Sequence, residues 1–252
     1  YTALNTLSLH DALPISAMFP PPNSGREPAH VVMFSLEMPA RELAMRLLCS
    51  RARVNLQKMR SSRPDAQTQL DLVQASNEYR GKPLIVDDNG GQTILEIRAK
   101  CRRIARRRKL DMVVIDYIQL INGLDSSIAR EQQIAEVSRS IKAMAKEFQI
   151  PIIALAQLNR KSEDEARQPK MSDLRESGSI EQDADIVMLI SRPNVSQSKA
   201  AEAEAEQMGQ DGCYARQLIV AKNRNGPTND LDLLWNPGLT RFETPAKSHS
   251  NE

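Results

Sequence analysis

The sequence predicts an α/β protein with a largely parallel sheet flanked by helices. From Val31 onward, short apolar runs alternate with longer amphipathic stretches, as strands separated by crossover helices do. Near the end, two apolar runs flank a turn that contains Asn225, Gly226 and Pro227, which is typical of an antiparallel hairpin closing a sheet. The chain has 252 residues, 40% hydrophobic and 26% charged, which is sufficient for one domain with a substantial core.

Five short, mostly apolar runs are the predicted parallel strands. They lie at 31–36, 84–86, 112–115, 152–156 and 186–190. Helical spacing of apolar residues predicts helices at 39–53, 93–108 and 130–148. The strands of the terminal hairpin are placed at 218–221 and 231–235. Pro39 suits the first turn of the first helix, where its missing N–H costs nothing.

Three segments lack this alternation. Residues 1–29 are rich in proline, serine and asparagine, and residues 7–16 resemble translated sequencing adapter, so we expect an unstructured linker or an artefact joined to the gene. Residues 196–210 predict a mobile loop or short helix, and residues 245–252 a disordered tail. The predicted domain therefore covers 30–244.

The composition argues against several classes of protein. The formal net charge of +2 is too small to indicate a nucleic-acid binder by itself, and no apolar run approaches the roughly 20 residues that span a bilayer. No spacing suggests zinc, a disulfide framework or a Cys-His nucleophile among Cys49, Cys101, Cys213, His10, His30 and His249. These observations favour the cytoplasm, a reducing compartment, and no membrane partner.

One segment is strongly basic. Its cations are interleaved with apolar residues at helical spacing, and they are Arg98, Lys100, Arg102, Arg103, Arg106, Arg107, Arg108 and Lys109. An amphipathic helix with a solvated basic face is the commoner interpretation, and direct contact with phosphate is the alternative.

Polar residues that directly follow predicted strands are candidates for chemistry, because parallel α/β folds bind ligands at the carboxyl ends of strands. Asp116 could hold the Mg²⁺ of a nucleotide, or cap a turn. Glu37 could be a general base, or favour the dipole of the following helix. Gln157, followed by Asn159 and Arg160, could sense a terminal phosphate through its amide.

Five runs, taken in order, resemble the motifs of the DnaB helicase family. They are FSLEM at 34–38, VIDYIQL at 114–120, ALAQLNR at 154–160, DLRESGSIEQDAD at 173–185 and AKNRNGPT at 221–228. Together they cover the chain from about Val31 to Glu243. Five ordered motifs are far more specific than any one alone, and the fourth is the most distinctive.

The resemblance implies the carboxy-terminal ATPase domain of a replicative helicase. Such a domain has a RecA-like P-loop NTPase core that binds ATP and Mg²⁺ between the subunits of a homo-hexameric ring. Glu37 matches the catalytic glutamate, Asp116 the Walker B aspartate that holds Mg²⁺, and Gln157 the residue that couples phosphate state to the DNA loops. Lys222 and Arg224 match the lysine and arginine finger that reach the γ-phosphate in the next subunit. Without the resemblance they would be interpreted as surface charges.

The resemblance also implies a contact with single-stranded DNA. Arg175, Glu176 and Gly178 match the loop that lines the central channel of the ring. An arginine pairs with phosphate and a glycine lets backbone N–H groups approach closely, which suits a motor indifferent to base sequence. An ordinary loop, with Ser172 or Asp173 capping a short helix, is the alternative.

One motif of such an ATPase is absent from the sequence. A loop ending in Gly-Lys-Ser or Gly-Lys-Thr cradles the phosphates, but the sole Gly-Lys pair here, Gly81-Lys82, is followed by Pro83. In the family this loop precedes the strand matched by 31–36. We therefore expect that the Walker A loop, its central strand and its helix were lost by truncation, with the family's amino-terminal domain. Poor ATP binding, exposed sheet edges and aggregation should follow.

The leading hypothesis concerns the parent protein. It would unwind duplex DNA during replication by ATP-dependent 5′-to-3′ translocation on one strand, with a primase and a helicase loader as partners. The present chain would be inactive for lack of the phosphate loop. The alternatives are a non-catalytic module for single-strand DNA binding or ring assembly, and another RecA-like recombination or phage ATPase.

Overall fold

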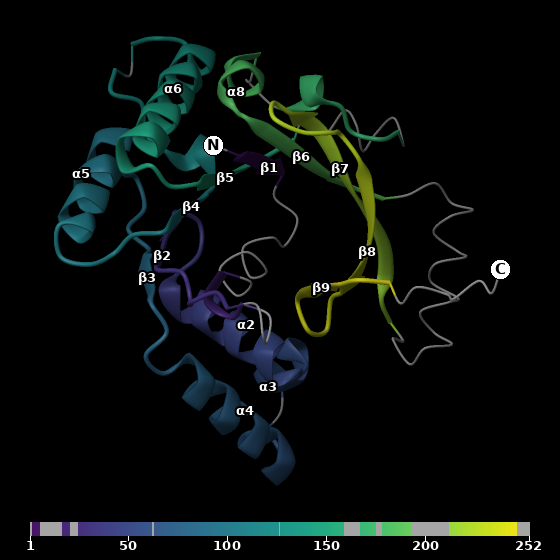
Figure 1. The fold of residues 1–252 in the computed structure, drawn as a ribbon. Helices are drawn as coiled ribbons and strands as arrows, with labels where there is room; N and C mark the ends of the chain where they lie inside the picture. Colours follow the sequence, from purple (N-terminus) through teal and green to yellow (C-terminus); the bar gives the residue numbers. More distant parts are fainter. Residues whose placement is uncertain are drawn as a thin grey trace.

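The computed structural model describes residues 2–5, 17–20, 25–61, 63–125, 127–158, 167–174, 178–192 and 212–245. Within these ranges the strands form one sheet in the order β3-β2-β4-β5-β1-β6-β7-β8-β9 (Figure 1). The parallel strands are β1 (Thr2–Asn5), β2 (Val31–Ser35), β3 (Leu84–Asp87), β4 (Met112–Asp116), β5 (Ile152–Ala156) and β6 (Ile186–Ser191). The antiparallel strands are β7 (Tyr214–Asn223), β8 (Asp230–Asn236) and β9 (Arg241–Glu243).

The predicted parallel strands, the terminal hairpin and the three predicted helices are confirmed. The described helices are α2 (Ala40–Ala52), α3 (Leu56–Ser61), α4 (Ala66–Tyr79), α5 (Ile94–Ala105), α6 (Arg130–Phe148) and α8 (Gly178–Asp183), with 3₁₀ turns η1 (Ile118–Leu120) and η2 (Met171–Asp173). Pro39 is the N-cap of α2 rather than a residue of its first turn. The helix α5 begins at a capping box of Thr93 and Glu96, and ends three residues before the predicted boundary.

The helices α3 and α4 were not predicted from the sequence. The helix α4 starts at Asp65, whose carboxylate accepts a hydrogen bond from Thr68 N at 2.7 Å. Its large apolar residues Leu70 and Val73 are 63% and 58% exposed, and Ala75 is its buried residue. A helix without a buried apolar stripe has no periodic signal to detect.

The core lies on both faces of the sheet. Alternation along β4 sends Val113 and Ile115 into one apolar cluster and Val114 into the other. The first cluster contains the buried faces of α5 and α6, and the second contains Leu43 and Leu47 of α2. Figure 1 shows α5 and α6 on one side of the sheet, and α2 with α4 on the other. Burial of each such Leu or Ile contributes about 1.5–3 kcal/mol.

The central position of the sheet differs from expectation. Thr2–Asn5 form β1 between β5 and β6, with Ala3 level with Ala154 and Val187. A strand needs only its backbone N–H and C=O groups to complete a ladder, so a segment without an apolar pattern can serve. The predicted gap at the centre of the sheet is therefore absent from the part of the chain described.

More of the amino-terminal segment packs on the sheet. Met18 is fully buried, and Ala17 O accepts a hydrogen bond from Ala29 N at 3.0 Å. Residues 1–29 are thus not wholly unstructured, while their proposed artificial origin stays a prediction. The predictions for residues 196–210 and 246–252 lie outside the described residues.

The basic segment forms ion pairs along α5. Arg98 and Arg102 both pair with Glu147 of α6, and Lys100 Nζ lies 2.6 Å from Asp87 Oδ2. The amphipathic-helix interpretation is confirmed, and contact with phosphate stays a prediction. Across the described ranges no helix combines the length and apolar character that a bilayer crossing needs. The three cysteines are buried thiols.

Candidate functional site at two edges of the sheet

Three predicted catalytic residues follow parallel strands at one edge of the sheet, the carboxyl edge. Asp116 ends β4 and is fully buried, Glu37 lies two residues beyond β2 and is exposed, and Gln157 directly follows β5. Ser35 is level with Asp116, and Leu36 N donates to Asp116 O at 2.8 Å. The parallel register therefore brings these residue types to one edge, as predicted.

The structure weakens the alternative interpretations of two of these residues. Glu42, not Glu37, is the acidic residue in the first turn of α2, and Asp88 Oδ2 accepts the hydrogen bond of Ala40 N at 2.8 Å. Tyr117, not Asp116, occupies the N-cap position of η1, and it makes no side-chain cap hydrogen bond. Neither carboxylate is the capping residue of the element that follows it.

Two further side chains shape this edge. Gln119 Oε1 accepts a hydrogen bond from Gln157 N at 3.2 Å, and Gln119 Nε2 donates to Gln157 O at 3.4 Å. Arg130 Nη2 donates to the carbonyls of Gln119 and Ile121 at 2.7 and 3.1 Å. The loop after β4 is thereby fastened to the end of β5. Gln119 stood inside a matched motif without a role, and no sequence signal pointed to Arg130.

The two predicted γ-phosphate contacts lie elsewhere. Lys222 and Arg224 lie at the end of antiparallel β7, where Asn223 is level with Ile186, the first residue of β6. That is the amino edge of the sheet, where the parallel strands begin. A five-residue strand spans roughly 16 Å, so these cations lie far from Asp116 within one chain.

The carboxyl end of α8 holds both cations. Lys222 Nζ donates to the carbonyls of Glu181 and Gln182 at 2.6 and 3.3 Å. Arg224 Nη2 donates to Gln182 O at 3.3 Å, and Nη1 donates to Asp185 Oδ1 at 3.0 Å. They are therefore not isolated surface charges. The sequence carried Asp185 inside a matched motif but offered no sign of this contact, which joins residues about 40 apart.

The predicted DNA segment is described only at its ends. Arg175 and Glu176 lie outside the described residues. Gly178 is the first residue of α8 and is exposed, and a Cβ added to it would meet no heavy atom within 4 Å, so packing does not demand glycine there. On the amino-terminal side, Leu174 forms a β-bridge with Leu158, next to Gln157. The segment thus leaves the carboxyl edge and returns at α8.

Residues before the DNA segment are held by an ion pair. Arg167 Nη1 and Nη2 lie 2.6 and 2.8 Å from the two oxygens of Asp173. The hydrogen bond from Arg167 lowers the pKa of the Asp173 carboxyl, although burial opposes the shift. Asp173 also accepts from Lys170 N at 2.7 Å, so it caps η2 rather than starting an α-helix.

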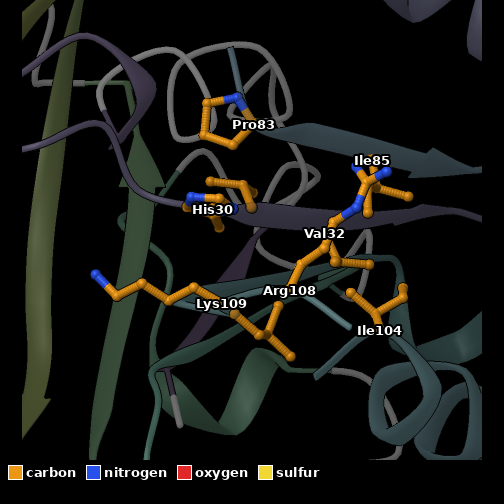
Figure 2. A pocket seen from close by; sticks show the side chains of 9 residues that line it. His30, Val32, Pro83, Ile85, Ile104, Arg108 and Lys109 are labelled. Atoms are coloured by element: carbon orange, nitrogen blue, oxygen red, sulfur yellow. The ribbon is translucent and has the colours of Figure 1, made fainter. Parts of the chain in front are cut away.

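A small pocket lies away from the carboxyl edge. Figure 2 shows His30, Pro83 and Lys109 among its lining side chains. His30 and Pro83 directly precede β2 and β3, so the pocket is at the amino ends of these strands. It does not coincide with Asp116, and we assign it no part in nucleotide binding.

Comparison with known proteins decides the family. The family model for the DnaB-like helicase C terminal domain matches residues 14–244. The chain belongs to this DnaB-like helicase family. Its match begins before the predicted domain start at residue 30, and the domain boundaries themselves stay predictions.

Curated relatives of this family member are replicative helicases. It is 44% identical over 215 residues to the replicative DNA helicase DnaB of Leifsonia xyli subsp. xyli, covering 84% of this chain and 44% of that protein. It is 39% identical over 215 residues to the same helicase of Geobacillus stearothermophilus, covering 84% and 45%. The chain thus spans under half the length of these relatives.

Solved structures agree with the fold. One solved helicase-like ATPase domain superposes with a TM-score of 0.81 at 28% identity, covering 96% of this chain and 83% of that one. A DnaB-like replicative helicase, described with its interactions with primase, gives a TM-score of 0.80 at 29% identity, covering 96% and 56%. The predicted RecA-like α/β fold class is confirmed.

Proposed function

We propose that this chain is the motor domain of an ATP-dependent replicative DNA helicase. The separation of the candidate residues is the observation that carries the proposal. Asp116, Glu37 and Gln157 lie at the carboxyl edge, and Lys222 and Arg224 at the amino edge. The two groups cannot meet one nucleotide in one chain, but head-to-tail copies would bring them together.

The arrangement suits a homo-hexameric ring with ATP at each junction. Asp116 would hold Mg²⁺, Glu37 would activate the attacking water, and Lys222 and Arg224 would reach from the next subunit to the γ-phosphate. No group of three potential metal ligands occurs among the described residues. Mg²⁺ would therefore depend on water and phosphate oxygens besides Asp116, as is common for this ion.

The DNA segment connects the two edges. Its start is bridged beside Gln157, and its end is α8, which Lys222 and Arg224 hold. This supports contacts of Arg175, Glu176 and Gly178 with the backbone of single-stranded DNA, coupled to the state of the phosphate. We further propose 5′-to-3′ unwinding at a replication fork in the cytoplasm, with primase and a helicase loader as partners of the whole protein.

The chain by itself does not supply a full ATP site. Asp116 fits a metal-bound nucleotide, but the sequence contains no Gly-Lys-Ser or Gly-Lys-Thr loop to cradle the phosphates. Weak ATP binding and no turnover are expected of it.

A graft tests the proposal. Residues 1–30 are replaced by the segment of the Geobacillus stearothermophilus relative that precedes its FSLEM-like strand, which gives the grafted chain. ATP hydrolysis stimulated by single-stranded DNA should appear, and Asp116→Asn or Glu37→Gln should lower kcat by about a hundredfold or more. Asp232→Asn, an exposed carboxylate of β8, is the matched control. An active grafted chain that tolerates both changes at the carboxyl edge would contradict the assignment.

The missing phosphate loop favours one second candidate, a module that binds single-stranded DNA without using nucleotide. In that case the ungrafted chain would bind single-stranded DNA with an affinity that falls steeply with salt, and the graft would add no ATPase. The two candidates therefore predict opposite results for the same pair of chains.

A further inference from the structure

The end of α8 and the end of β7 are joined by a compact charge cluster. Lys222 and Arg224 donate to carbonyls of Glu181 and Gln182, in the last turn of α8. Such carbonyls have no partner within a helix, and cations are favoured beside them. Figure 1 shows α8 beside α6 and close to the strands β6 and β7. The cations therefore depend on α8 for their placement.

Asp185 gives Arg224 a second point of attachment. Its Oδ1 accepts a hydrogen bond from Arg224 Nη1 at 3.0 Å, and its carbonyl accepts from Arg224 N at 2.9 Å. The backbone and the guanidinium of Arg224 are thus held by one residue. Two-point attachment restricts a long side chain that would otherwise sample many rotamers.

Lys142 of α6 occupies the other oxygen of that carboxylate. Its Nζ donates to Asp185 Oδ2. Burial by itself would raise the pKa of Asp185, but the hydrogen bond with Lys142 helps to lower it to about 2. The carboxylate is therefore ionised at any physiological pH. Three side-chain cations around one carboxylate leave an excess of positive charge at this edge.

Arg224 is also accessible. Its side chain is 49% exposed. A guanidinium has five N–H donors, and Asp185 and Gln182 each engage one nitrogen, which leaves donors that can face an outside anion. The cluster has the form of a cation held in place before its anion arrives, which is how preorganised sites stabilise charge.

We propose that Asp185 is the positioning residue of Arg224, with Lys142 as its counter-ion, so that Arg224 and Lys222 face a phosphate group brought by a second copy of this chain. The inference rests on the proposed role of these cations. Because α8 begins in the DNA segment and ends in this cluster, a phosphate that pulls on the cations also pulls on α8.

The placement is measured on the chain as it exists, by nuclear magnetic resonance of arginine side chains. In the wild type the Arg224 Nη–H groups should exchange slowly. Asp185→Asn keeps the shape but removes the charge, and should speed that exchange by about tenfold. Asp185→Glu should restore part of the protection, and Asp232→Asn should leave it unchanged. Unaltered protection in Asp185→Asn overturns the proposal.

The consequence for chemistry is measured on the grafted chain. A misplaced arginine finger weakens only the transition state, because the neighbouring copy holds ATP. Asp185→Asn should therefore lower kcat by about tenfold to a hundredfold and leave KM for ATP within about twofold. Loss of general structure would instead move both constants and the unfolding midpoint together.

The two proposals fail differently. If Arg224→Ala lowers kcat and Asp185→Asn changes neither kcat nor the exchange, Asp185 does not position the finger and the helicase proposal stands. If Arg224→Ala leaves kcat of an active grafted chain unchanged, the finger assignment falls. If Asp185→Asn does not fold, Arg224→Lys replaces it in the exchange measurement, read at the last amides of α8. Lysine keeps the charge but cannot reach Asp185 and Gln182 together, so faster exchange supports the proposal and unchanged exchange refutes it.

Discussion

The carboxyl and amino edges of the sheet reach their chemistry by different routes. At the carboxyl edge, Asp116 and Gln157 are placed by the strands they follow, β4 and β5. At the amino edge, Lys222 and Arg224 are placed by α8 and Asp185, about 40 residues away in the chain. A site at strand ends is encoded locally, whereas a site held by a distant helix depends on tertiary packing.

Mixing grafted chains should show the largest effect and tests whether the two edges belong to two copies. Asp116→Asn and Arg224→Ala should each lower kcat by about a thousandfold. A one-to-one mixture should regain roughly a quarter of the activity, because about a quarter of head-to-tail junctions pair an intact Asp116 with an intact Arg224. Steady-state ATPase assays measure this. A mixture as inactive as its components would place both groups on one copy's nucleotide.

Truncation inside α6 tests the support that both edges share. Ile141 is fully buried in the core beside Lys142. Ile141→Ala should lower the free energy of unfolding by about 2–5 kcal/mol, because it leaves a cavity. Leu70→Ala, on an exposed face of α4, is the control and should change it by less than about 0.5 kcal/mol. Urea titration of both variants measures the difference, and equal effects would contradict the assigned core.

Acid titration sharpens the description of the amino edge. The pKa of Asp185 is lowered from 3.8 to about 2, so its ion pairs add stability above about pH 4 that is lost as the pH falls towards 2. Screening of the partly exposed carboxylate leaves about 1–2 kcal/mol. Asp185→Asn should lack this component, so its unfolding free energy should fall less than that of the wild type between pH 4 and 2. Parallel curves would contradict the assignment.

The smallest effect is expected at the carboxyl edge. Gln119→Ala removes the two hydrogen bonds to the backbone of Gln157 and should lower the free energy of unfolding by about 1 kcal/mol. The amide of Leu158 should exchange faster, because its neighbour loses its support. Gln132→Ala, an exposed residue of α6, is the control. Equal amide exchange at Leu158 in both variants would show that Gln119 does not hold this strand end.

Much of the architecture could be predicted because strands and amphipathic helices leave periodic apolar patterns. The runs at 112–115 and 152–156 were located within one residue of β4 and β5. The helix α4 was missed because Leu70 and Val73 face outward. Residues 2–5 were missed because a central strand can be selected by the ladder beside it and not by its own side chains.

The sequence by itself determined the order of strands and helices, the family motifs and the carboxyl edge, since all follow from patterns a few residues long. Only the tertiary structure decided that Thr2–Asn5 complete the sheet, and that Asp185 and α8 hold Lys222 and Arg224. Those contacts join segments far apart in the chain. Their partners are backbone carbonyls and single charges, which every sequence contains, so no local pattern distinguishes them before the chain has folded.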